Sequence, residues 1–113
     1  MTEAAALALT VAIEVPLAAA LGAALCPDRR AGAALRGAVV AAVGTAVTHP
    51  FVWAAALALS PRVGVPAAIV LGEAGAIAAE AVGYRWVYGW RRAAAVSLVV
   101  NGISASLGVV FTW

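Results

Sequence analysis

Four long apolar runs, each separated from the next by a few polar residues, constrain this chain more than any other feature. The runs cover about residues 4–25, 33–59, 65–88 and 93–113 of the 113. At about 1.5 Å of rise per residue, each run is long enough to cross the ~30 Å hydrocarbon core of a bilayer as a helix. The sequence therefore predicts an all-α fold, with residues 1–113 forming one integral membrane domain, a four-transmembrane-helix bundle.

The composition indicates which solvent surrounds this bundle. Hydrophobic residues make up 65% of the chain and charged residues only 11%. Such a chain has too few polar side chains to cover a surface that faces water, so we expect the lipid bilayer to be its main partner. The chain has no Lys, and its arginines lie near the ends of the runs. This placement sets membrane orientation, and we expect no nucleic-acid partner.

The arginines also predict the topology. Two of the three connections are arginine-rich, with Arg29, Arg30 and Arg36 at the first and Arg85, Arg91 and Arg92 at the third. The second connection has only Arg62. Because positive residues stay on the cytoplasmic side, we predict a multi-pass protein of the cytoplasmic membrane with both termini outside. We then expect interfacial aromatic residues at the inner membrane surface, at Trp86, Tyr88 and Trp90, and at the outer surface, at Trp113.

Polar side chains interrupt all four apolar runs. The most costly to bury are Glu14, His49, Glu73, Glu80 and Asn101. An ionisable group in a spanning segment costs roughly 2.5–3.5 kcal/mol on insertion scales, so it normally faces a protein interior and marks a site. We therefore predict a polar core, which Thr45, Thr48, Tyr84 and Ser104 are expected to complete.

The third run has the clearest geometry among these residues. Glu73 and Glu80 share one helical face with Ile77 and Tyr84, and the two carboxylates are expected about 10 Å apart along the axis. Burial and the repulsion of like charges disfavour three ionised acids in one bundle. We therefore expect at least one of Glu14, Glu73 and Glu80 to be neutral near pH 7.

His49 lies in the second run, directly before a helix-interrupting proline. Pro50 cannot donate a hydrogen bond, so the carbonyl of Ala46 is left free. Here His49 could carry protons, bind a metal or form an interhelical hydrogen bond. The short connection between the second and third runs makes them antiparallel neighbours, so we predict one shared site for His49 and Glu73. With Glu14 they could bind a divalent metal; no other cofactor is predicted.

The fourth run carries a polar stripe, made of Ser97, Asn101, Ser104 and Gly108. We expect the two serines to join helices and Asn101 to contact the acids. Counting from the helix ends predicts two tiers, an outer one of Glu14, Thr48, His49 and Glu73 and an inner one of Thr45, Glu80 and Asn101. Gly75, Ala79 and Gly83 form a small-residue ladder that predicts close helix packing, including packing between copies of the chain.

Two resemblances accompany these patterns. The segment Ala12-Ile13-Glu14-Val15, the small size and the four helices look like small multidrug resistance transporters, whose first-helix glutamate binds protons or cationic substrate. The third run here lacks their aromatic and glycine signature, and the strong arginine bias argues against their dual topology.

The closer resemblance is to small four-helix membrane proteins of bacteria and archaea for which no activity is established. It rests on three motifs, Thr48-His49-Pro50-x-x-Trp53, Glu73-x6-Glu80-x3-Tyr84 and Asn101-x-x-Ser104-x3-Gly108. The resemblance implies that these residues form one constellation.

The patterns favour a small proton- or cation-coupled transporter or channel-like subunit, because buried carboxylates beside proline-freed carbonyls suit such a site. Four helices enclose little volume, so we expect a homo-oligomer or a membrane partner subunit. The alternatives are a membrane-embedded metal-dependent enzyme and an accessory subunit whose polar groups only join helices. Enzyme activity is the weaker prediction and catalytic residues are not identified, because the chain has one His and no HExxH motif.

Overall fold

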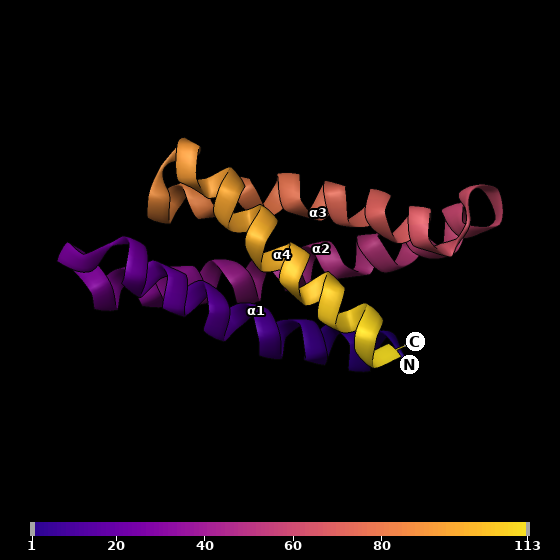
Figure 1. The fold of residues 1–113 in the computed structure, drawn as a ribbon, viewed down its shortest axis with the longest axis horizontal. Helices are drawn as coiled ribbons and strands as arrows, with labels where there is room; N and C mark the ends of the chain where they lie inside the picture. The colour runs from indigo at the N-terminus through magenta and orange to yellow at the C-terminus, as the bar shows by residue number, and fades with distance from the viewer. Residues whose placement is uncertain (1, 113) are drawn as a thin grey trace.

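The computed structural model describes residues 2–112, and these form four long helices (Figure 1). The helices are α1 (Glu3–Leu25), α2 (Arg30–Val63), α3 (Val65–Tyr88) and α4 (Trp90–Thr112), with a short 3-10 helix, η1 (Pro27–Arg29), before α2. Each of the four is long and apolar enough to cross a membrane. The predicted all-α, four-helix fold is confirmed.

The connections are shorter than the sequence suggested. Helix α2 begins at Arg30 rather than near 33 and continues through Pro61 to Val63, so Arg62 lies in its last turn. Only Gly64 separates α2 from α3, and only Gly89 separates α3 from α4. Both glycines have positive φ, 85° and 73°, a conformation that a residue with a Cβ rarely adopts. A single glycine can therefore reverse the chain at each point.

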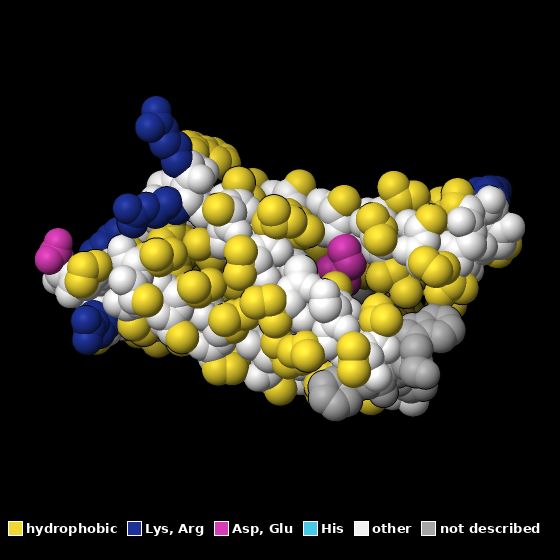
Figure 2. Space-filling model, in the orientation of Figure 1, with side chains coloured by type: hydrophobic (Ala, Val, Ile, Leu, Met, Phe, Trp, Pro, Cys, Tyr) yellow, Lys and Arg dark blue, Asp and Glu magenta, His cyan; other side chains and the backbone are white. Residues whose placement is uncertain are grey.

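Successive helices run in opposite directions, and α4 crosses the bundle to contact both α3 and α1 (Figure 1). Helix α1 begins and α4 ends at the same end of the bundle, the termini end. At the opposite end, the arginine-rich end, the cationic side chains gather while most of the visible face is hydrophobic (Figure 2). Which end faces the cytoplasm stays a prediction, and Trp113 lies outside the described residues.

Helices α1 and α2 approach closely through small residues. A Cβ at Gly37 would lie 2.6 Å from the carbonyl oxygen of Ala18, and one at Gly22 would overlap the carbonyl of Ala33. Close backbone approach of this kind stabilises helix pairs in lipid. The predicted ladder on α3 is not continuous in the bundle. Gly83 packs against Val40, whereas a Cβ at Gly75 would meet nothing within 4 Å.

Arginines at the arginine-rich end satisfy carbonyls at the ends of two helices. An Nη of Arg29 donates to the Val87 carbonyl at 2.7 Å, and an Nη of Arg92 donates to the Leu25 carbonyl at 3.2 Å. Cations are favourable at helix C-termini, where carbonyl groups lack intrahelical partners. Two cation–π pairs lie at the same end, Arg36 with Trp86 and Arg85 with Trp90.

Candidate functional site

Glu14 lies in the middle of α1 and is 1% exposed. Its carboxylate accepts hydrogen bonds from two hydroxyl groups, that of Thr45 on α2 and that of Ser104 on α4; the Ser104 bond is 2.6 Å long. Glu14, Ala18 and Gly22 are the buried residues of α1, spaced four apart on one face. The same face that packs closely on α2 therefore brings Glu14 to its donors.

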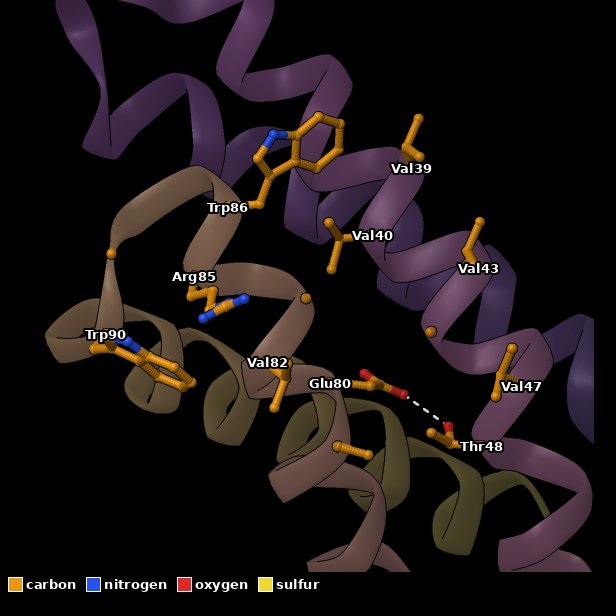
Figure 3. Close-up of a pocket in the computed structure, with 14 residues that line it drawn as sticks. Val39, Val40, Val43, Val47, Thr48, Glu80, Val82, Arg85, Trp86 and Trp90 are labelled. Atoms are coloured by element: carbon orange, nitrogen blue, oxygen red, sulfur yellow. Dashed lines mark hydrogen bonds between the residues drawn. The ribbon is translucent and has the colours of Figure 1, made fainter.

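Glu80 has a matching environment in the middle of α3, where it is 3% exposed. The Thr48 hydroxyl of α2 donates to its Oε1 at 2.9 Å (Figure 3), and the Asn101 Nδ2 of α4 donates to its Oε2 at 2.9 Å. A Cβ at Gly44 would lie 3.1 Å from the Cγ of Glu80, so the glycine leaves room for this side chain. The donors are neutral groups rather than cations.

The two carboxylates belong to one hydrogen-bonded arrangement, here called the central network: Glu14, Thr45, Thr48, Glu80, Asn101 and Ser104. One acid comes from α1 and the other from α3, and each accepts one bond from α2 and one from α4. The donors sit three residues apart on α2 and on α4, a spacing that keeps them on one helical face. The central network therefore links all four helices.

The prediction of two separate polar tiers is wrong. Glu14 of the expected outer tier bonds Thr45 of the expected inner tier, and Glu80 bonds Thr48 in the same crossed manner. Helix α2 begins earlier than expected, and a glutamate side chain reaches about one helical turn from its own Cα. Counts from the helix ends therefore did not determine depth.

Other members of the α4 stripe behave partly as expected. The Ser97 hydroxyl donates to the Ile77 carbonyl of α3 at 2.7 Å, so this serine does join helices. Asn101 contacts an acid, which confirms its prediction. Ser104 differs, because it joins helices through the carboxylate of Glu14. Tyr84 is fully buried one turn from Glu80, and its hydroxyl has no hydrogen-bond partner within residues 2–112.

Glu73 lies in a different environment, a cavity of about 370 Å³ that all four helices line. We call it the Glu73 pocket. It occupies the termini half of the bundle, and its polar lining consists of Thr10, His49, Ser60, Glu73 and Ser104. Leu9, Val52, Trp53, Ile69 and Val109 are among its apolar walls. Thr10 was not among the predicted site residues, although its spacing of four residues from Glu14 places both on the same helical face.

The Glu73 carboxylate lacks the donors that its two counterparts have. Among the described side chains, which end at residue 110, no hydrogen bond or ion pair to this group is found, and the acids that act on it electrostatically are Glu14 and Glu80. The residue is half-buried and lines this cavity. The molecule therefore contains one acid that a ligand could reach at membrane depth.

His49 lines the Glu73 pocket but makes no hydrogen bond to Glu73 in the described part of the chain. Its ring stacks near Trp53, with 6.3 Å between centroids, and it interacts electrostatically with Glu3 at the start of α1. Its buried Nε2 has no hydrogen-bond partner among residues 2–112. His49 and Glu73 therefore line the same pocket, but no direct hydrogen bond joins them in the described part of the chain.

The metal set suggested by the sequence is not assembled. Among residues 2–112, no group of three or more His, Cys, Asp or Glu side chains is placed to hold a metal ion. Glu14 is occupied by its two hydroxyl donors, while His49 and Glu73 line the pocket without a mutual bond. The three residues therefore do not form one coordination sphere in this conformation.

A second cavity lies between α2 and α3 in the arginine-rich half (Figure 3). It is a groove of about 840 Å³ with Glu80 and Thr48 in its lining. Its remaining lining is mainly valine with Trp86, and Arg85 and Trp90 lie at one end. Both oxygens of Glu80 already accept hydrogen bonds from Thr48 and Asn101, so this carboxylate, unlike Glu73, has donors within the bundle.

No family model, curated protein or solved structure matches this chain. A functional proposal therefore rests on the geometry and chemistry of its own four helices.

Proposed function

We propose that this protein is a small proton- or cation-coupled transporter or channel-like subunit in which Glu73 is the carboxylate that exchanges its proton or cation. One observation carries the proposal. Glu73 faces a cavity inside a membrane-spanning bundle and has no hydrogen-bond donor among residues 2–112. An ionisable group at this depth that makes no structural bond is costly, and such groups mark ion and proton pathways.

The electrostatics of the bundle support the same proposal. Glu14 and Glu80 are the charges that act on Glu73, and all three are acids. Like charges repel strongly where water is scarce, so a proton or a bound cation must offset some of this charge. Glu80 also lines a cavity, but both of its oxygens accept hydrogen bonds. Glu73 lines a cavity with no donor found among the described side chains, so its charge can be offset by an ion that enters and leaves.

Ser104 provides a physical link between the pocket and the central network. Its hydroxyl donates to Glu14, and the same residue lines the Glu73 pocket. A ligand in the Glu73 pocket can therefore lie against a residue that is hydrogen-bonded to Glu14. The residues of the three sequence motifs lie mostly in these two regions, which supports treating them as one constellation.

A complete pathway needs a route to the arginine-rich end as well. The single chain places closely packed small residues between α1 and α2 there. We therefore expect a homo-oligomer or a membrane partner subunit to contribute to the route, in the cytoplasmic membrane with both termini outside.

Proton flux in liposomes tests the proposal directly. Purified protein is reconstituted with a pH-sensitive dye inside, and an outside acid pulse is applied with valinomycin and K⁺ present; parallel runs add a Na⁺ gradient. We expect flux above that of empty liposomes, and at least a tenfold loss in Glu73→Gln. Asp28→Asn is the matched control, because Asp28 is an exposed acid in η1. Equal flux in Glu73→Gln and in the parent protein, or none above empty liposomes, would contradict the proposal.

An accessory subunit is the second candidate, and a specific observation favours it. The central network joins all four helices, and its acids are fully engaged by neutral donors, as expected of groups that only hold helices together. This candidate predicts that Glu80→Ala impairs assembly while Glu73→Gln changes neither assembly nor flux. Blue-native gels of membranes that carry each variant measure assembly, and the liposome flux of Glu73→Gln separates the two candidates, since only the transporter proposal expects that flux to fall.

A further inference from the structure

We propose that the Glu73 pocket binds a small protonated primary or secondary amine with an apolar body, whose ammonium group donates to the Glu73 carboxylate. This inference deepens the proposed function by naming a ligand class. It rests on that function for the transport of the amine, but not for its binding.

The charge of the pocket selects a cation. Among the described residues that line it, the titratable side chains are those of Glu73 and His49, and there is no Arg. Glu14 and Glu80 add further negative potential at Glu73, and among the described residues the acid that acts on His49 is Glu3. A ligand with a positive charge supplies the counter-charge that this carboxylate lacks, whereas an anion would meet three acids without a compensating arginine.

The walls and the volume select a small ligand with an apolar body. Leu9, Val52, Ile69 and Val109 contribute hydrocarbon surface from all four helices. The volume of about 370 Å³ lies near the lower end of the roughly 300–1,000 Å³ of small-molecule sites. Trp53 also lines the pocket, and an indole ring attracts ammonium groups through its π face. A single aromatic ring or a short alkyl chain beside the charged group suits this space.

The missing hydrogen bonds at Glu73 select an ammonium group that carries N–H. The carboxylate accepts no bond within residues 2–112, so a ligand with N–H donors satisfies it. The hydroxyls of Thr10 and Ser104 line the same pocket and donate to the Ala6 carbonyl and to Glu14, which leaves their oxygens as further acceptors for N–H groups of a ligand. A quaternary ammonium has the charge but no donor, and it leaves these acceptors unpaired.

Three ligands of similar shape separate these features. Calorimetric titration of the purified protein in nanodiscs uses 2-phenylethylamine, its N,N,N-trimethyl derivative and 2-phenylethanol. We expect binding of the amine that is at least tenfold tighter than that of the other two. Its N-methyl derivative, which keeps N–H, should bind within a few-fold of the parent amine. Equal affinity for the alcohol, or tighter binding of the trimethyl compound, would overturn the inference.

Variants assign the binding to Glu73. Glu73→Gln should lower amine affinity at least tenfold, whereas Glu73→Asp should retain part of it and Asp28→Asn all of it. Size-exclusion chromatography and circular dichroism of each variant confirm that the bundle has formed. Undiminished amine affinity in folded Glu73→Gln would exclude this pocket as the site.

The binding and flux results together distinguish the two proposals. Amine binding that depends on Glu73, in a protein that moves neither protons nor amine across liposomes, supports this inference and contradicts the proposed transport. Proton flux that depends on Glu73, in a protein with no measurable affinity for the amine, overturns this inference and leaves the proposed function intact.

Discussion

The central network and the Glu73 pocket use the same residue type in opposite ways. Glu14 and Glu80 are almost completely buried, and each accepts two hydrogen bonds from neutral side chains. Glu73 is half-buried on a cavity and accepts none within residues 2–112. The role of a membrane-embedded glutamate therefore depends on the hydrogen-bond donors around it, because they decide whether it holds helices together or stays free for a ligand.

This contrast predicts separable effects on stability and on binding. A buried acid whose donors lose their acceptor leaves several polar groups unpaired in the bundle, which is costly. An acid that makes no bond leaves nothing unpaired when it is removed. Four experiments test the contrast, ordered by the largest loss of stability expected in each.

The largest loss is expected for Gly37→Ala. Its Cβ would lie 2.6 Å from the Ala18 carbonyl oxygen, so α1 must move away from α2 and Glu14 away from Thr45. Overpacking of this kind typically costs 1–3 kcal/mol, and we expect about 3 kcal/mol here because the clash is with backbone. Unfolding by sodium dodecyl sulfate, followed by circular dichroism, measures the loss. Gly75→Ala is the control, since its Cβ would meet nothing within 4 Å; equal stability of the two variants would contradict the close contact.

Glu80→Ala should come next, with a loss of about 1–3 kcal/mol, because the Thr48 hydroxyl and the Asn101 amide lose their acceptor. Glu73→Ala should stay within about 0.5 kcal/mol of the parent protein, as substitutions away from bonded groups usually do. The same unfolding assay compares the two. If removal of Glu73 destabilised the bundle as much as removal of Glu80, the division into a bonded network and an open acid would be wrong.

Ser104→Ala tests the residue that belongs to both regions. The loss of its bond to Glu14 should cost about 1 kcal/mol, near the usual net worth of a hydrogen bond. Because Ser104 also lines the Glu73 pocket, amine affinity should fall a few-fold. The matched control is Ser106→Ala on the same helix, since Ser106 is exposed and its hydroxyl donates to the Gly102 carbonyl of its own helix rather than to another helix. Thermal unfolding in detergent and calorimetric titration provide the two readings, and a drop in only one of them would remove the link between the regions.

The smallest effect on stability is expected for Ala56→Leu, which places extra methyl groups in the Glu73 pocket. Filling an open cavity should change stability by less than about 0.5 kcal/mol, while amine affinity should fall at least fivefold because less volume remains. Ala54→Leu, on the exposed side of α2, should change neither quantity. Unchanged amine affinity in Ala56→Leu would show that the ligand binds elsewhere.

The sequence predicts most residues of the polar core, but it does not predict which acids are hydrogen-bonded in the central network and which one lines the Glu73 pocket. The cost of burying ionisable groups in apolar runs predicts that Glu14 and Glu80 lie inside the bundle, and both do. The stripe on the last run predicts that Asn101 contacts an acid, as it does with Glu80. The sequence does not reveal that Glu73 alone lacks donors, because that depends on which hydroxyl groups of two other helices come within 3 Å of each carboxylate.

The sequence by itself determined the solvent of this protein and its secondary structure. Runs of about 20 apolar residues are long enough to cross a bilayer, and in lipid each backbone group must be satisfied within its own helix, so four helices follow without tertiary information. Only the tertiary structure decided which carboxylates accept hydrogen bonds from neighbouring helices and which one lines the Glu73 pocket. The glycine contacts between α1 and α2 and the crossing of α4 from α3 to α1 set distances of a few ångströms, and hydrogen bonds form or fail on that scale.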